Sequence, residues 1–365
     1  MASASRTSSN LSRESHPGIP VVSVVMPTYN GEKFLRPAIE SILNQTFPDF
    51  ELIVIDDGSI DSTPSILADY KGNDTRLIVL TSKRNLGIAG ATNRGLAAAR
   101  GKYLALQDHD DISLPHRLQT QVDFLDSNPD TALVASAATL IDDSGATQGD
   151  FPQPCNEIDL KWELLWSCPI HHTAVMMRRS AIVDVGGYPN DPALRFAEAW
   201  EPLAQIAMRY RIANLPDRLV LWRRHSAATS IQHRQQALAA CEATVLRNIY
   251  RLSKPHGADA TFDLEFRYSG LRAFLYTPGV KPPQLPAQQV IAGLLLLCEV
   301  QERFYQINDF PRRLAARHRR TLNWSWGKHA VGLAMRAPWT WRCRVRILLL
   351  GVRLLSVWAW AVITG

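Results

Sequence analysis

The strongest constraint on the fold is a series of short apolar runs, each followed by an amphipathic segment. Four of these runs, VVSVVMP (21–27), ELIVIDD (51–57), RLIVLT (76–81) and KYLALQ (102–107), lack the polar–apolar alternation of half-exposed strands, so they are typical of strands buried on both faces. The segments between them, such as GEKFLRPAIESILNQT (31–46), have apolar residues at helical spacing. This alternation predicts an α/β fold with a doubly wound, mostly parallel sheet.

The organisation of the chain follows from where this pattern starts and stops. Residues 1–20 are Ser-rich without an apolar run, which predicts a disordered leader and no signal peptide. The strand–helix pattern continues through a helix after Pro115 and a strand at 131–142, so we assign 21–235 to one α/β domain. Residues 236–365 are predicted to form a helical C-terminal region, in which VIAGLLLLC (290–298) is too short to span a bilayer and is expected to be a buried helix.

The charge distribution indicates the kind of partner. The net charge is +6, but from Glu302 to the end there are many arginines and only two acids, Glu302 and Asp309. This pattern favours an anionic membrane surface over nucleic acid as the partner of the tail. The five cysteines are scattered without a CxxC pair, which favours a reducing compartment. We therefore expect a cytoplasmic protein, peripheral at the inner face of the cell membrane.

The tail at about 337–365 is basic, Trp-rich and apolar. Ile347 to Gly365 contains 19 residues with one charge, Arg353. Interfacial or re-entrant attachment is the favoured interpretation, and a true span or a helix buried against protein are the alternatives.

Two acidic clusters follow predicted buried strands, Asp56-Asp57-Gly58-Ser59 and Asp108-His109-Asp110-Asp111. Turn formation or helix capping could explain one such cluster. Three carboxylates within four residues repel one another unless a cation neutralises them, and Mg²⁺ or Mn²⁺ with oxygen ligands would do so. The chain has neither GxxxxGK[ST] nor a GxGxxG after the first strand, which disfavours a P-loop or dinucleotide fold.

The motifs PTYN, DDGS, the NxGxxxxxNxG run and the DxDD box, in this order, resemble glycosyltransferase family 2 from about residue 22 to about residue 233. The resemblance implies a GT-A fold and an inverting, metal-dependent transfer from a nucleotide sugar, most often a UDP-sugar. It also implies that Pro27, Thr28, Tyr29 and Asn30 line the base pocket.

Further roles are implied by the same resemblance. Asp57 would accept from the base, and Arg84, Asn85 and Asn93 would lie near the nucleotide or donor sugar. Asp108 and Asp110 would contact ribose and metal, with Asp111 continuing the box and His109 as a spacer. In RRHSAATSIQ, His225 would approach the metal or diphosphate. His171 or His172 could touch acceptor or phosphate, or be ordinary loop histidines, and Gly186-Gly187 would turn the chain back to the site.

The sequence departs from the family where the catalytic base is expected. The family has a Glu-Asp pair there, but FAEAWEPLAQIAMRY (196–210) has Glu198 followed by Ala199. The segment is predicted to start a helix with Glu198 and Glu201 in its first turn, on a shared face. Three interpretations remain: Glu201 or Glu198 is the base, the protein binds donor without efficient transfer, or the base comes from another segment.

Together these observations predict a metal-dependent inverting glycosyltransferase. It would move a hexosyl-type sugar to a hydroxyl of a glycan or lipid-linked acceptor in surface polysaccharide synthesis. The alternative is a catalytically weak sugar-nucleotide-binding partner or regulator of another transferase. A nucleotidyltransferase is less favoured because no basic GxG-type loop follows the first strand.

Overall fold

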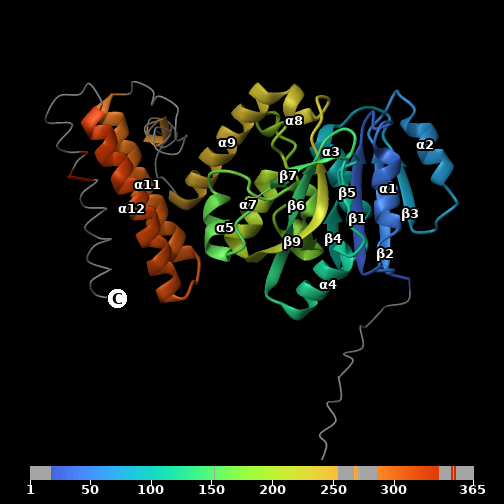
Figure 1. The fold of residues 1–365 in the computed structure, drawn as a ribbon, viewed down its shortest axis with the longest axis horizontal. Helices are drawn as coiled ribbons and strands as arrows, with labels where there is room; N and C mark the ends of the chain where they lie inside the picture. The colour runs from blue at the N-terminus through green and yellow to red at the C-terminus, as the bar shows by residue number, and fades with distance from the viewer. Residues whose placement is uncertain are drawn as a thin grey trace, which may run out of the picture.

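The computed structural model describes residues 18–151, 153–253, 267–269, 271, 286–336, 347 and 349–350. Most of the predicted leader and nearly all of the tail at 337–365 therefore lie outside the described residues. Figure 1 shows a central sheet covered by helices, with the α11–α12 pair on one side of it.

Within the described residues, nine strands form a mixed sheet. Along the sheet they come in the order β3 (Leu77–Thr81), β2 (Phe50–Asp56), β1 (Val22–Thr28), β4 (Tyr103–Leu106), β8 (Met176–Arg178), β6 (Thr131–Ile141), β9 (Arg211–Arg223) and β5 (Ile112–Ser113), and β7 (Thr147–Phe151) pairs with β6. Strands β3, β2, β1, β4, β6 and β9 point in one direction, and β8, β5 and β7 oppose them. The predicted α/β fold with a mostly parallel sheet is confirmed.

Helices cover both faces of the sheet because side chains alternate along each strand. On one face, Val22, Val24 and Met26 of β1 pack with α1 (Leu35–Leu43), α2 (Thr63–Tyr70) and α4 (Arg117–Ser127). On the other face, Val25 belongs to the core built with α3 (Gly87–Ala98), α5 (Glu157–Glu163), α6 (Arg179–Asp184) and α7 (Trp200–Arg209). The second core is the larger and continues into the C-terminal helices.

The C-terminal region is helical, as predicted. The helix α9 (Arg234–Ser253) begins where the composition changes near residue 235, and α11 (Ala287–Ile307) and α12 (Arg312–Arg336) follow. The expected buried helix at 290–298 lies within α11, where Val290, Leu294 and Leu297 are buried. Trp162 of α5 anchors this region through aromatic contacts with Phe304, His318 and Trp326. No helix in the described part of the chain is both long and apolar enough to cross a membrane.

Two strands near the site had no clear sequence signal. β8 has three residues, and the apolar pattern of β9 is interrupted by Pro216 and Asp217. Three short helical elements lie near these strands in the sequence: η1 (His172–Ala174) precedes β8, η2 (Pro192–Leu194) lies between α6 and α7, and α8 (Thr229–Gln232) follows β9.

The helix expected at 196–210 begins later than predicted. α7 starts at Trp200, so Glu201 is in its first turn, but Glu198 lies in the turn before it. The two glutamates therefore do not share a helix face.

Candidate active site

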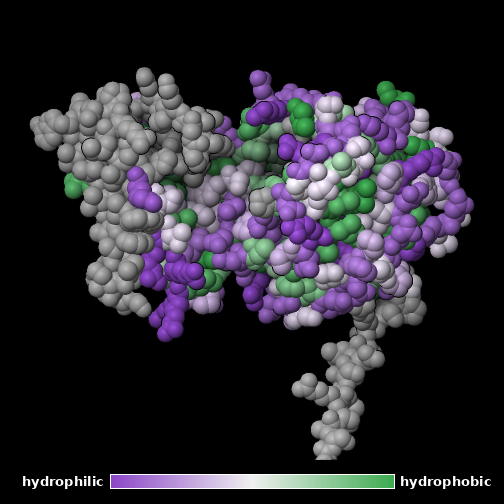
Figure 2. Space-filling model, in the orientation of Figure 1, coloured by the Kyte–Doolittle hydropathy of each residue, from purple (hydrophilic) through white to green (hydrophobic). Residues whose placement is uncertain are grey.

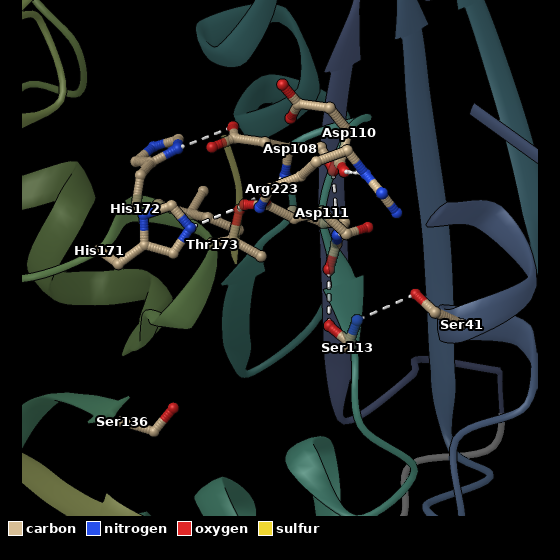
Figure 3. Close-up of polar contacts among 12 residues, drawn as sticks. Ser41, Asp108, Asp110, Asp111, Ser113, Ser136, His171, His172, Thr173 and Arg223 are labelled. Carbon is tan, nitrogen blue, oxygen red and sulfur yellow. Dashed lines mark hydrogen bonds and ion pairs between the residues drawn. The ribbon is translucent and has the colours of Figure 1, made fainter. Parts of the chain in front are cut away.

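The two acidic clusters meet at one edge of the sheet. Thr28 and Asp56 are paired at the carboxyl ends of β1 and β2, and Asp108 follows the end of the neighbouring β4. Figure 3 shows Asp108, Asp110 and Asp111 together with His171, His172 and Arg223 at this edge. This is where parallel α/β sheets bind ligands.

Asp57 caps the start of α3. Both of its oxygens accept from the Leu86 amide, at 3.0 and 2.8 Å, and Oδ2 also accepts from the Gly87 amide at 2.9 Å. Burial raises the pKa of Asp57, while these amides and the Ser82 hydroxyl oppose the shift. The predicted base-binding carboxylate is thus held rigidly by the helix it caps.

The PTYN segment is tied to the DDGS turn. Asn30 adopts a left-handed conformation with φ of 50°, its amide donates to Ser59 Oγ at 2.9 Å, and its Oδ1 accepts from the Ile60 amide at 3.0 Å. Tyr29 is 42% exposed, whereas the Thr28 hydroxyl is buried and has no hydrogen-bond partner. Of the predicted pocket residues, Tyr29 is therefore accessible to a ligand, Thr28 is buried beneath the surface, and Asn30 holds the loop in place through its two hydrogen bonds.

Asn85 and Asn93 of the NxGxxxxxNxG run form hydrogen bonds with the start of α3 and with the loop after α6. The Gly87 amide donates to Asn85 Oδ1 at 2.9 Å. Asn93 Nδ2 donates to the Tyr188 carbonyl at 2.7 Å, and the Tyr188 amide donates back to Asn93 Oδ1 at 2.9 Å. The expected turn at Gly186 and Gly187, with φ of 85° and 75°, brings Tyr188 to this position.

The backbones of Arg84 and Pro27 lie beside these motifs. A Cβ at Gly58, where φ is 78°, would come within 3.1 Å of the Arg84 carbonyl carbon. Pro27 lies in β1 opposite Ile55 of β2. Both residues thus lie next to the predicted nucleotide pocket. Among the described residues, no side-chain contact assigns either of them a role there.

Asp111 is the buried member of the acidic box, 1% exposed. Its Oδ1 accepts from the Arg223 amide at 2.8 Å, and its Oδ2 accepts from Thr173 Oγ1 at 2.6 Å and lies 2.7 Å from His171 Nε2. Burial raises the pKa of Asp111. For His171, burial lowers the pKa but the charge of Asp111 raises it, and the net shift is upward. His171 also stacks on Trp222, so this histidine is a buried partner of Asp111.

Asp108 lies further from the core. His172 Nδ1 lies 3.1 Å from Asp108 Oδ1, and His172 Nε2 lies 2.7 Å from the Tyr188 hydroxyl. Burial raises the pKa of Tyr188, so this hydroxyl keeps its proton. Burial raises the pKa of Asp108, but His172, His171 and the Thr173 hydroxyl together lower it more, so the net shift is downward and this carboxylate stays ionised.

Asp110 pairs with the predicted histidine. His225 Nε2 lies 3.0 Å from Asp110 Oδ2, and the His225 ring packs against Phe34 with centroids 4.9 Å apart. Arg223, two residues earlier, donates from Nε to the Asp110 carbonyl at 2.9 Å. His225 therefore lies beside Asp110 of the acidic box, and its expected approach to a metal or diphosphate stays a prediction.

His109 has a more specific position than a spacer. A Cβ on Gly31 would lie 2.8 Å from His109 Cδ2 and 2.6 Å from Thr28 Oγ1. The ring therefore packs over the bare backbone of Gly31, next to the unpartnered Thr28 hydroxyl. The sequence signal that was missed is the glycine directly after PTYN.

Arg117 is fully buried beneath the acidic box. Its guanidinium donates to the carbonyls of Leu106 and Val175 at 2.8 and 3.1 Å, and to Ser113 Oγ at 2.8 Å. Burial lowers the pKa of Arg117 to about 9, and the charges of Asp111 and Asp108 oppose this. Nothing in the local sequence HRLQTQ distinguishes this arginine from an exposed one.

Two groups of side chains could hold a cation. Ligand atoms of Asp108, Asp111 and His171 lie within 4.8 Å of one another. However, the oxygens of Asp111 already accept from its buried partners, whereas Asp108 and Asp110 have side chains 33% and 20% exposed. Carboxylates beside one imidazole form a donor set that suits Mg²⁺ or Mn²⁺. In the same acidic box, Asp110 Oδ2 and His225 Nε2 lie 3.0 Å apart and form a second carboxylate–imidazole pair.

Glu198 and Glu201 lie in different environments. Glu198 is 7% exposed, and burial raises its pKa, while backbone amides and the charges of Arg195 and His172 oppose the shift. Its carboxylate thus lies within electrostatic reach of the histidine that contacts Asp108. Ala199, at the expected base position, packs against the hydrophobic core.

Glu201 faces the C-terminal helices. It is 1% exposed, forms an ion pair with Arg251 of α9, and Gln205 Nε2 donates to its Oε1 at 3.3 Å. Its Oε2 is buried without a hydrogen-bond partner. The contacts of Glu201 are those of a residue that joins α7 to α9.

Comparison with known proteins connects this geometry to a family. The family model described as Glycosyl transferase family 2 matches residues 23–186. An uncharacterized glycosyltransferase of Haemophilus influenzae is 30% identical over 249 residues, which are 64% of this chain and 75% of that protein. The amylovoran biosynthesis glycosyltransferase AmsE of Erwinia amylovora is 28% identical over 54% of this chain and 74% of its own length.

A solved structure has the same fold. The S. aureus protein TarS, residues 1–349 in complex with UDP, aligns with a TM-score of 0.51 at 20% identity and covers 77% of this chain and 80% of that one. The GT-A architecture expected from the sequence motifs is thereby confirmed.

The Glu201–Arg251 contact leads to a stability prediction. Arg251→Met should lower the free energy of unfolding by about 1–3 kcal/mol, because it leaves the buried Glu201 carboxylate without its cation. Arg247→Met is the matched control one turn earlier on α9, since Arg247 pairs with the half-exposed Asp191 and should contribute about 0–1 kcal/mol. Urea unfolding of both variants measures the difference. Equal losses would contradict a structural role for Glu201.

Proposed function

Since this chain belongs to glycosyl transferase family 2, we propose that it transfers a sugar, with inversion, from a nucleoside diphosphate donor to an acceptor hydroxyl. The observation that carries the proposal is the acidic box at the strand ends, where Asp108, Asp111 and His171 have ligand atoms within 4.8 Å of one another and His225 Nε2 lies 3.0 Å from Asp110 Oδ2. The proposed donor is a UDP-sugar, carrying a hexosyl group. The proposed acceptor is a glycan or lipid-linked glycan in surface polysaccharide synthesis, which the name of the Erwinia relative supports.

The nucleotide would lie across the ends of β1 and β2. The oxygens of Asp57 are fixed in place by the Leu86 and Gly87 amides that donate to them. A uracil N3–H could donate to Asp57 while the exposed Tyr29 covers the base. The likeness of the fold to a protein solved with UDP supports this choice of base.

We propose that Mg²⁺ or Mn²⁺ binds Asp110 and His225, with Asp108 adjoining. The ion would supply a positive charge that stabilises the leaving diphosphate. Asp111, which the sequence analysis grouped with the ligands, would instead position the box through Arg223 and Thr173. This arrangement leaves the partly exposed oxygens of Asp108 and Asp110 directed to substrate.

The base that takes the proton from the acceptor hydroxyl is, in our proposal, Glu198. It is the buried carboxylate near His172, and its raised pKa brings it closer to neutral pH, where a general base works best. Glu201 is occupied by Arg251. The displaced diphosphate leaves on the face opposite the attacking hydroxyl, as inversion requires.

We further propose that the C-terminal helices attach the protein to the inner face of the cell membrane. The helix α12 has no acidic residue, and its Arg312, Arg313 and Arg317 are exposed. Figure 2 shows hydrophilic residues gathered where α11 meets α12. The sequence at 337–365, nearly all of which lies outside the described residues, is basic and Trp-rich, a composition that suits an anionic membrane surface.

The metal proposal predicts cation-dependent nucleotide binding. Calorimetric titration with UDP should show tighter binding in Mn²⁺ than in EDTA. Asp110→Asn and His225→Ala should each weaken the Mn²⁺-dependent part by about 10–100-fold, because they remove a ligand. Asp150→Asn, in the exposed Arg218–Asp150 pair, is the control and should bind as the wild type does. Binding that ignores Mn²⁺ would disprove this metal site.

The base proposal predicts different outcomes for the two glutamates. Glu198→Gln should lower the hydrolysis rate of UDP-N-acetylglucosamine or UDP-glucose by about 10²–10⁴-fold without weakening UDP binding. Glu201→Gln is the control and should retain most activity. Since the pKa of Glu198 is raised, the acidic limb of the wild-type pH–rate profile should lie above the ordinary glutamate value of about 4.3.

Unchanged hydrolysis in Glu198→Gln would exclude this residue as the base. Donor binding without any turnover in the wild type would favour the alternative, a sugar-nucleotide-binding partner of another transferase, which the alanine at position 199 already suggests.

The membrane proposal predicts flotation with anionic vesicles. The full chain should float with vesicles that contain phosphatidylglycerol but not with phosphatidylcholine alone. Replacing Arg312, Arg313 and Arg317 with Gln should weaken binding about 100-fold, at about 1 kcal/mol per arginine. Deleting residues 337–365 should weaken it further, and high salt should weaken the wild type. Equal flotation with neutral vesicles would contradict the electrostatic part of the proposal.

A further inference from the structure

Phe196 has a backbone conformation that is rare for an aromatic residue. Its φ is 73°, and among the described non-glycine residues only Asn30 shares a positive value. Asparagine tolerates the left-handed region, but a bulky side chain is strained there because its Cβ approaches backbone atoms. Such strain persists only where surrounding contacts enforce it.

The enforcing contact is an aromatic stack. The Phe196 ring lies parallel to the His233 ring, with centroids 4.1 Å apart and planes 6° apart, and the Arg195 guanidinium lies 5.2 Å from the Phe196 ring. His233 Nδ1 lies 3.0 Å from Gln236 Oε1 at the start of α9, which fixes the histidine ring. The stack thus joins two loops that are 37 residues apart in the chain.

Each of these loops carries a group of the proposed site. Glu198 is two residues after Phe196. The Ala197 amide closes the turn that contains Phe196 by donating to the Leu194 carbonyl at 3.0 Å, and the Trp200 amide closes the next turn, which contains Glu198, by donating to the Ala197 carbonyl at 3.1 Å. His225 lies in the segment that leads from β9 through α8 to His233. The stack is therefore a direct physical link between the segment of the proposed base and the segment of the proposed metal-binding histidine.

Simple packing would not explain this geometry. An aromatic ring can cover a histidine from an ordinary backbone conformation, and a turn with positive φ would favour Gly or Asn. Here the strained backbone and the stack occur at the same residue, directly before Glu198. A strained residue beside a catalytic group is a known way to hold that group in one orientation.

We propose that Phe196 is a positioning residue, which through its stack on His233 couples the placement of Glu198 to the segment that carries His225. Binding that draws His225 inward would then move His233, Phe196 and the Glu198 turn together. This inference rests on the proposed function, because it assigns the purpose of the link to the same site.

The first test uses hydrogen–deuterium exchange on the full chain with UDP and Mn²⁺. In the wild type, UDP–Mn²⁺ should protect backbone amides of the Phe196–Glu201 segment as well as the segment around His225. His233→Ala should keep UDP binding and protection near His225 but lose protection at Phe196–Glu201. His233→Phe, which can preserve the stack, should restore it, and Tyr250→Ala on α9 serves as a control that changes neither.

The second test compares variants at Phe196 itself. Phe196→Ala and His233→Ala should each lower the rate of UDP-sugar hydrolysis about 10-fold with unchanged UDP affinity, since small misplacements of a catalytic group have effects of this size. The double variant should be no slower than either single variant, because both remove one interaction. Phe196→Gly should unfold at a higher temperature than Phe196→Ala, because glycine accepts the positive φ.

The outcomes separate this inference from the function on which it rests. A wild type that fails to bind UDP in Mn²⁺ contradicts the proposed function. A wild type that binds UDP but shows no protection at Phe196–Glu201, additive losses in the double variant, or equal unfolding temperatures for the Gly and Ala variants overturns the coupling alone.

Discussion

A carboxylate buried away from solvent must accept hydrogen bonds from nearby donors. The arrangement of the site depends on which segments supply the donors to Asp111. Its donors come from the backbone of β9 and from the η1 segment, which are distant from it in sequence. By drawing Arg223 and Thr173 to the end of β4, it also brings along their neighbours His225 and His172. Those two histidines then face Asp110 and Asp108, respectively. The exposed half of the acidic box is thus oriented by its buried member.

The parts that could be predicted from the sequence are those with local signals. Continuous apolar runs identified β1, β2, β3, β4 and β6, and the parallel arrangement placed the acidic clusters at one edge of the sheet. β8 and β9 were missed because one is three residues long and the other contains Pro216 and Asp217. The partners of each site residue depend on contacts between distant segments. Periodicity could not show that Arg117 is buried, that Asn93 holds Tyr188, or that His109 packs on Gly31.

The segment with the missing aspartate illustrates the same limit. The spacing of Glu198 and Glu201 suggested that either could replace the base, on the assumption that both lie on one helix. The helix starts at Trp200, so the two side chains have different environments, one near His172 and one against Arg251. Ala199 fits because its small side chain packs against the core at the helix start. An alanine at the position where the family resemblance implies an aspartate therefore fits this fold, and the neighbouring Glu198 carries a carboxylate.

The buried guanidinium of Arg117 has a consequence for the working cycle. It is a permanent cation fixed under the acidic box by backbone carbonyls, so part of the negative charge there is balanced by the protein itself. The folded state therefore does not depend on an exogenous ion to neutralise this edge of the sheet. A cation bound as proposed could leave with the product and be replaced with the next donor while the scaffold stays intact. Occupancy of the proposed site would then depend on exchange kinetics and cellular supply, independently of the lifetime of the native protein.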